Sequence, residues 1–189
     1  MIQEEVINKL GNNIRKHIEL YPKLSVKAEQ FESLFACATG SDWTPYNHNP
    51  GSDMITSMEG MRKPSLKSGI IKDGFLTISS HRTTKFDTID KKIDFLCNTD
   101  YDSYICLARP DKKIHTYKLV YFTKSTIDFK NLTWSHTLDK KGKQSGWIAT
   151  NENHSIRVRI IKNMSDQVWI DIHESLINIL NSYNYDVTE

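Results

Sequence analysis

A chain of 189 residues with 38% hydrophobic side chains is long enough for one domain with one core, spanning residues 1–189. No run approaches the roughly 18–20 apolar residues of a membrane span, and the start MIQEEVINKL lacks the basic-then-apolar order of a signal peptide, so we expect a cytoplasmic protein with no membrane partner. The net charge of +2 excludes a strongly basic or acidic chain, and the widely spaced Cys37, Cys97 and Cys106 indicate reduced core thiols, not a zinc site.

Two helices are predicted at the start of the chain. Apolar residues recur at helical spacing over residues 2–20, and Pro22 follows them. A second helix is predicted from the N-cap Ser25 and should bury Phe31 and Phe35. Gly, Pro, Asn and Asp then cluster in residues 41–53, which indicates a loop.

Short β-type runs follow this loop. MITSM (54–58), PSLKSGII (64–71) and FLTIS (75–79) are predicted strands, with Lys72-Asp73-Gly74 as a hairpin turn. Thr88 is a suitable cap for a crossover helix over residues 88–96.

The second half predicts further strands. YICLAR (104–109) has the composition of a buried strand, and HTYKLVYF (115–122) alternates. Residues 146–172 supply more strands around a turn at 163–166, and ESLINILNSY (174–183) has the apolar spacing of a closing helix. We therefore expect an α/β (α+β) fold, a central mixed β-sheet flanked by helices.

One pair of residues has the chemistry of phosphodiester hydrolysis. Lys67 follows Asp53 by fourteen positions, in the alternating run Ser65-Leu66-Lys67. On neighbouring strands, the Asp53 and Lys67 side chains would lie on one face of the sheet. A carboxylate holds Mg²⁺ against the phosphate, and an ammonium orients or deprotonates the attacking water.

The order of these residues resembles a known family. A helix bearing a glutamate (EQFESLFA), a loop with Trp and His (DWTPYNHNPGSD), then Asp53 and a strand SLKSG are similar to the PD-(D/E)XK nucleases, in particular the type II restriction endonucleases. The resemblance implies a restriction-endonuclease-like fold and Mg²⁺ as cofactor. It further implies that Asp53 and Glu32 or Glu29 bind the metal and that Lys67 is catalytic.

Ser65 departs from the family pattern, which has Glu or Asp at that position. Some restriction enzymes have Ser there and recruit a carboxylate from elsewhere, and Glu32, Glu59 or Asp73 would have to serve, with Glu32 preferred. Singly, Asp53 could be a turn residue, Lys67 an exposed strand lysine and Glu32 a surface helix residue. Their joint order favours the nuclease.

Polar donors concentrate after the strand that ends near residue 79. His81, Arg82, Thr83, Thr84 and Lys85 form a run that could contact DNA phosphates and bases, although a polar loop before the next helix is the alternative. Residues 61–92 and 110–147 each contain eight Lys or Arg against three acids. Such blocks suggest a polyanion-binding face, or simply solvated lysines.

The expected function is Mg²⁺-dependent, sequence-specific hydrolysis of double-stranded DNA by a type II restriction endonuclease. Palindromic sites favour a homodimer, although small monomers that nick each strand in turn are also possible. A non-enzymatic nucleic-acid-binding protein of phage or regulatory origin is the alternative, and an RNase or repair nuclease of the same fold is a third.

Overall fold

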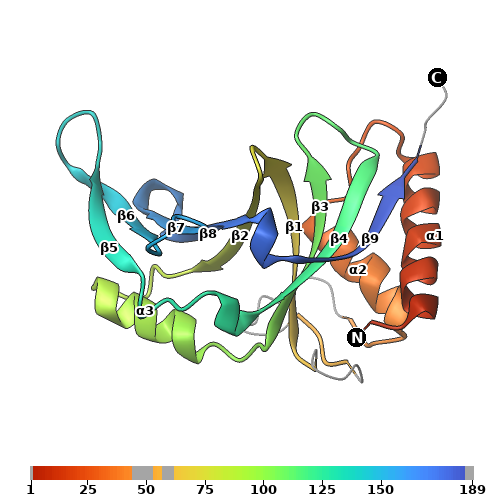
Figure 1. Ribbon diagram of the computed structural model, residues 1–189, viewed down its shortest axis with the longest axis horizontal. Helices are drawn as coiled ribbons and strands as arrows, with labels where there is room; N and C mark the ends of the chain where they lie inside the picture. The colour runs from red at the N-terminus through yellow and green to blue at the C-terminus, as the bar shows by residue number, and fades with distance from the viewer. Residues whose placement is uncertain (1, 44–52, 57–61, 186–189) are drawn as a thin grey trace.

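The computed structural model describes residues 2–43, 53–56 and 62–185. Its strands are β1 (Pro64–Lys72), β2 (Phe75–Arg82), β3 (Ser103–Pro110), β4 (Thr116–Thr123), β5 (Thr133–Leu138), β6 (Gln144–Thr150), β7 (Ile156–Ile161), β8 (Gln167–His173) and β9 (Asn178–Asn184). Its helices are α1 (Glu4–Leu20), α2 (Ala28–Thr39) and α3 (Ile89–Asn98), with short 3₁₀ turns η1 (Lys124–Thr126), η2 (Lys162–Met164) and η3 (Glu174–Leu176). The described residues form a mixed α/β fold around one large sheet (Figure 1).

The sheet is mixed, as the sequence predicts. Its strand order is β5-β6-β7-β8-β2-β1-β3-β4-β9, and among the described strands β1 and β3 form the parallel pair. Helix α3 lies between β2 and β3 in the chain, as predicted, and Thr88 accepts a hydrogen bond from the Lys91 N–H at 3.4 Å. The β1–β2 connection is also confirmed: Asp73 and Gly74 both have positive φ, 51° and 78°, which the tightest hairpin turns require.

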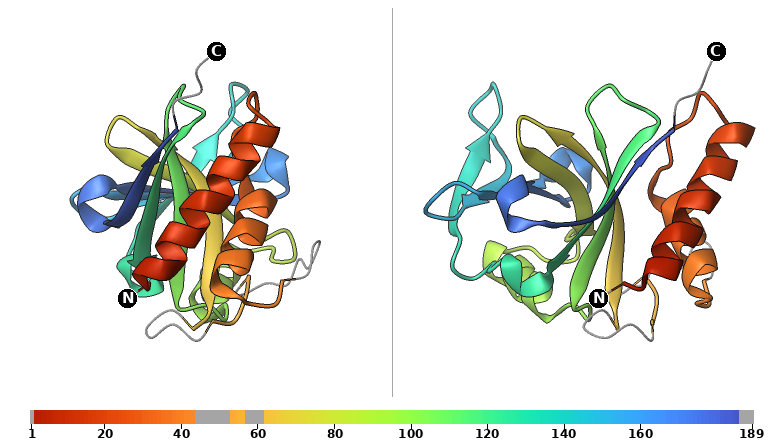
Figure 2. Two further views of the ribbon diagram at one scale, coloured as in Figure 1. Left: turned by 90° about the vertical axis from the view of Figure 1, so that its right-hand side faces the viewer. Right: turned by 45° about the vertical axis from the view of Figure 1, so that its right-hand side comes forward.

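Helices cover both faces of the sheet. Leu66, Ile105 and Leu107 pack into one cluster with α1 and α2, whereas Tyr104 and Cys106 belong to the cluster that includes residues of α3. Successive residues of β3 therefore point to opposite faces of the sheet. A strand that is buried on both faces is expected to be a continuous apolar run, as this one is in the sequence. Figure 2 shows α1 and α2 as one layer against the sheet.

The first helix contacts the last strand. The Tyr183 hydroxyl donates to the Ile7 carbonyl at 2.9 Å, and the Tyr185 hydroxyl donates to the Gly11 carbonyl. A Cβ on Gly11 would lie 2.8 Å from the Tyr183 ring, so glycine permits this close approach in the middle of a helix.

The predicted C-terminal helix is wrong. Residues 178–184 form β9, which pairs antiparallel with the edge of β4, and only Glu174–Leu176 keep a helical turn. Asn178, Asn181 and Ser182 have low helix propensity. The edge of β4 offers backbone N–H and C=O groups, and β9 pairs with them.

Smaller expectations also change. Helix α2 begins at Ala28 after the N-cap Lys27, not at Ser25. The described part of the predicted MITSM strand, residues 54–56, is not in a strand. Cys37 is exposed and Cys106 is buried, so the expectation of three core thiols is wrong for Cys37. No helix within the described ranges is long and apolar enough to cross a membrane.

Candidate active site at the open end of the β1–β2 pair

Strands β1 and β2 pair along only half their length. Their register runs from Lys72↔Phe75 to Gly69↔Ile78, and beyond it residues 64–68 of β1 have no paired residue on β2. A Cβ on Gly69 would lie 2.8 Å from the Thr77 carbonyl oxygen, so the strands are closest immediately before they separate. This opening exposes backbone donors of β1 to a partner from outside the sheet.

Asp53 is that partner. Its backbone N–H donates to the Pro64 carbonyl at 3.0 Å, and its Oδ2 accepts the Leu66 N–H. The same Oδ2 accepts the Ser65 hydroxyl at 3.3 Å and the Lys67 ammonium at 3.2 Å. Asp53 therefore lies in a bend beside β1, not on a neighbouring strand, but the structure does bring its carboxylate to Lys67.

The Asp53–Lys67 pair retains unused hydrogen-bonding capacity. The two side chains are 19% and 16% exposed. Within the described ranges, Asp53 is the only hydrogen-bond partner of the Lys67 ammonium, which leaves two N–H donors, and Oδ1 of Asp53 accepts no bond. As far as the described residues go, these atoms have capacity left for a ligand.

Glu32 supplies a second carboxylate nearby. It lies on α2, and the Trp43 indole N–H donates to its Oε2 at 3.4 Å. Burial raises the pKa of Glu32, and the negative charge of Asp53 raises it further, while Trp43 and Lys67 oppose the shift. Two carboxylates that repel each other beside an ammonium would gain stability from a divalent cation.

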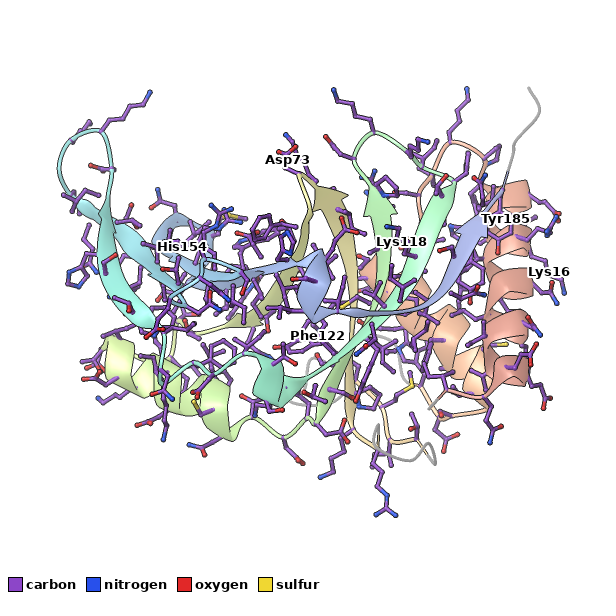
Figure 3. The ribbon with its side chains drawn as sticks, in the orientation of Figure 1. Lys16, Asp73, Lys118, Phe122, His154 and Tyr185 are labelled. Atoms are coloured by element: carbon purple, nitrogen blue, oxygen red, sulfur yellow. The ribbon has the colours of Figure 1, made fainter. Side chains whose placement is uncertain are left out.

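The other acids considered for this role do not join the site. Asp73 lies in the β1–β2 turn, at the opposite end of β1 from Asp53 (Figure 3). Glu29 is exposed in the first turn of α2, and its charge adds only the smallest contribution to the raised pKa of Glu32. Glu59 lies outside the described residues.

A β-bulge brings His81 to the same region. The β2–β8 register shifts between Ser79↔Trp169 and Arg82↔Gln167, so β2 has one residue more than β8 across this interval. The His81 ring lies 5.5 Å from the ring of Tyr101 and 5.8 Å from that of Phe95. A bulge can re-aim a side chain in this way, and bulges are frequent beside active sites.

His81 is consequently a neutral, enclosed group. Burial lowers the pKa of His81 to about 4, the positive charge of Lys67 lowers it further, and Asp53 opposes the shift. Its Nε2 is buried and has no hydrogen-bond partner in residues 2–43, 53–56 and 62–185. His81 therefore lines the region around Asp53 and Lys67 instead of standing in an exposed loop.

The rest of the predicted DNA-binding run is divided. Thr83 is fully buried, and its hydroxyl donates to the Asp166 carbonyl at 3.0 Å, so the expectation that it contacts DNA does not fit the structure. Arg82, Thr84 and Lys85 are exposed. These three remain candidates for contact with a ligand.

Sequence reasoning missed the tyrosine hydroxyls beside His81. The hydroxyls of Tyr101 and Tyr104 are 2.5 Å apart, and Tyr104 is 3.4 Å from the Ser80 hydroxyl. Burial above all raises the pKa of Tyr104 to about 12, so its hydroxyl stays protonated. The strand YICLAR was predicted from its apolar residues. That pattern does not indicate that the hydroxyls of Ser80, Tyr101 and Tyr104 lie within hydrogen-bonding distance of one another in turn.

The described residues alone offer few metal ligands. In the part of the chain that the structure describes, no three or more His, Cys, Asp or Glu residues are grouped to hold a metal ion. Asp53 and Glu32 fit Mg²⁺ best among the candidates, because that ion keeps several waters and commonly uses one or two carboxylates together with substrate phosphates.

The comparisons add no relatives to this geometry. No protein-family model matches the chain, and no curated protein matches it either. The arrangement of Asp53, Lys67 and Glu32 is therefore the main indication of what the protein does.

Proposed function

We propose that the protein is a Mg²⁺-dependent nuclease that hydrolyses double-stranded DNA, of the type II restriction endonuclease kind. The observation that carries the proposal is the 3.2 Å contact between the Asp53 carboxylate and the Lys67 ammonium at the open end of the β1–β2 pair. Glu32 supplies the second carboxylate, which compensates for Ser65 in the place of an acid.

Each residue has a distinct role in this proposal. Oδ1 of Asp53, together with Glu32, would hold the metal, which lowers the pKa of a bound water and offsets negative charge on the phosphate. Ser65 and the Leu66 N–H fix the orientation of Asp53 through Oδ2. Lys67 uses its free N–H donors to orient the attacking water or to stabilise the phosphate as charge develops.

The reaction needs no cosubstrate other than water. The water oxygen forms a bond to phosphorus, the P–O bond to one deoxyribose breaks, and the leaving oxygen takes up a proton. Recognition of a palindromic site would require a homodimer, because two-fold DNA symmetry is matched by two-fold protein symmetry. Arg82, Thr84 and Lys85 are the exposed residues from the predicted DNA-binding run.

The test is cleavage of mixed-sequence plasmid DNA by the full chain with Mg²⁺, and with EDTA in its place. We expect discrete fragments that disappear with EDTA and fall by about 100- to 1000-fold in rate for Asp53→Asn, since one electrostatic contact to a transition state has about that value. Lys118→Met is a matched control, because Lys118 makes an ion pair of the same 3.2 Å length with Glu174, away from Asp53.

The alternative function is nucleic-acid binding without cleavage. Ser65 in place of an acid and the sparse metal ligands favour it. A DNA mobility shift with no cleavage under any metal would support binding alone and refute the nuclease. Cleavage of RNA without cleavage of DNA would assign the site to a ribonuclease.

A further inference from the structure

Four chain connections lie along one long side of the molecule, the side away from Asp53. They are residues 21–27 between α1 and α2, 73–74 between β1 and β2, 111–115 between β3 and β4, and 139–143 between β5 and β6. All four lie at the top in every view, with the β5–β6 turn at the left of Figure 1 and the α1–α2 connection toward its right (Figures 1 and 2). We call this side the four-turn surface.

The four-turn surface is basic. Within two residues of the four connections, the cations are Lys23, Lys27, Lys72, Arg109, Lys112, Lys113, Lys140, Lys141 and Lys143, and the acids are Glu19, Glu29, Asp73, Asp111 and Asp139. These are nine of the chain's 25 Lys and Arg but five of its 23 Asp and Glu, so the rest of the chain is net acidic. The net charge of +2 therefore hides a dipolar molecule.

These cations are not neutralised by the protein. The ion pairs among the described residues involve eight other Lys and Arg and none of these nine. Eight of the nine are exposed, and Arg109 is half-buried. The Asp139 carboxylate is occupied by the turn itself, since it accepts the backbone N–H groups of Lys141 and Lys143 at 2.8 and 2.9 Å.

A groove of about 470 Å³ adjoins this surface. Lys27, Lys72 and Arg109 line it, together with Asp111 and the serines Ser25, Ser68 and Ser79. Thr77 also lines it, but its hydroxyl donates to the Asp171 carboxylate at 2.7 Å. Hydroxyl and cationic donors are the groups that most often contact phosphate oxygens of DNA. The indole Nε1 of Trp169, another residue of the groove, is buried and has no hydrogen-bond partner among the residues that the structure describes.

We propose that the four-turn surface and its groove bind the sugar–phosphate backbone of double-stranded DNA, separately from the Asp53–Lys67 pair. Charge complementarity selects a polyanion and excludes a second copy of the same surface, because like charges repel. Lysines on three separate turns and at the end of β1 suit a partner whose charges repeat along its length. This proposal does not require that the DNA be cut.

An anionic membrane is the rival partner. Leu24, Ile114 and Leu138 are exposed on the same turns, at 55%, 39% and 64%, and apolar residues beside lysines also suit a lipid surface. The groove favours DNA, because its hydroxyls and cations offer contacts to phosphate oxygens from several sides.

The test measures binding of a labelled DNA duplex by fluorescence anisotropy in EDTA, where no cleavage can occur. We expect Lys112→Glu/Lys113→Glu to weaken binding by at least about 10-fold and to reduce the slope of log Kd against log salt by about 2, one for each lost phosphate contact. Lys140→Glu/Lys141→Glu should act similarly. Lys9→Glu/Lys16→Glu carries the same change in charge on α1, where Lys16 points away from the turns (Figure 3), and should bind as the wild type does.

The outcomes separate this proposal from the nuclease. Equal weakening by the α1 control would reduce the effect to net charge and overturn the proposal, as would binding to phosphatidylserine vesicles without binding to DNA. Circular dichroism of each variant excludes misfolding. Intact binding by Asp53→Asn together with absence of cleavage in the wild type would refute the nuclease and leave the four-turn surface standing.

Discussion

Two lysine–aspartate pairs in this protein have opposite surroundings. Lys92 on α3 is fully buried, and its ammonium donates to Asp166 at 2.8 Å and to the carbonyls of Thr83 and Phe86. Lys67 on β1 is 16% exposed and donates only to Asp53 among the described residues. All three N–H groups of the Lys92 ammonium are used, whereas two of those of Lys67 have no partner in the described part of the chain.

The difference separates a structural ion pair from a site. Lys92 ties the segment that follows β2 to the turn before β8, and a buried charge of this kind persists only when every donor is satisfied. Lys67 contacts one carboxylate among the described residues, and its side chain is partly exposed. Unused hydrogen-bonding capacity beside a second acid, Glu32, therefore distinguishes the candidate site better than charge alone.

The largest expected effect is on stability at the buried pair. Lys92→Met should lower the free energy of unfolding by about 3–5 kcal/mol, because it leaves Asp166 and two carbonyls without their partner. Urea unfolding followed by circular dichroism measures this change. Lys91→Met, which removes an exposed ion pair one position away, should change it by no more than about 0.5 kcal/mol. An equal loss of stability in Lys92→Met and Lys91→Met would contradict the difference between the buried and the exposed ion pair.

At the Asp53–Lys67 pair, a substitution should reduce activity much more than stability. Lys67→Met should reduce the rate of DNA cleavage by about 100- to 1000-fold while it lowers the free energy of unfolding by at most about 1 kcal/mol. Cleavage assays and urea unfolding of the same preparation measure both quantities. A variant that unfolds easily but still cuts would show that Lys67 is structural.

The neutral His81 predicts a pH dependence of stability. Its pKa is about 4 in the fold against 6.5 when unperturbed, so the unfolded chain binds more protons between these values. His81 should therefore contribute stability that is complete above pH 6.5 and lost as the pH falls to 4, by about 3 kcal/mol in total. His81→Phe keeps an aromatic ring. Urea unfolding at each pH gives the free energy of unfolding of both proteins, and the difference between them isolates this contribution. The same pH dependence in both proteins would mean that His81 titrates normally.

A smaller effect is expected at the start of α3, which leads to Lys92. Thr88→Ala should lower the free energy of unfolding by about 1 kcal/mol, because the Lys91 N–H loses its capping partner. Thermal unfolding measures the change, and Thr88→Ser should restore most of it. A loss as large as that of Lys92→Met would place the stability of α3 in its cap, not in its buried ammonium.

Local patterns predicted much of the fold. Helix α1, the turn at Asp73 and Gly74, and helix α3 with its cap Thr88 all follow from signals contained within a few residues. Strand β9 failed because the choice between helix and strand depended on the edge of β4, about sixty positions earlier in the chain. Strand β5 was missed because Thr133–Leu138 is mostly polar, and its pairing with β6 defines it.

The candidate site was predictable only in part. The order of Asp53 and Lys67 suggested that they meet, and the structure places them 3.2 Å apart. The inward position of His81 depends on a bulge against β8, and the burial of Thr83 depends on Asp166, both distant in sequence. A run of polar residues therefore looked like an exposed loop although part of it faces inward.

The contacts between α1 and the final strand also bear on how the protein is made. Tyr183 and Tyr185 bind carbonyls of α1 across separations of 176 and 174 residues. During translation α1 leaves the ribosome before the tyrosines that bind its carbonyls. Helix α2 and strands β3 and β4, which share its apolar cluster, can cover α1 earlier, so the contacts of Tyr183 and Tyr185 complete this packing after most of the sheet has been synthesised.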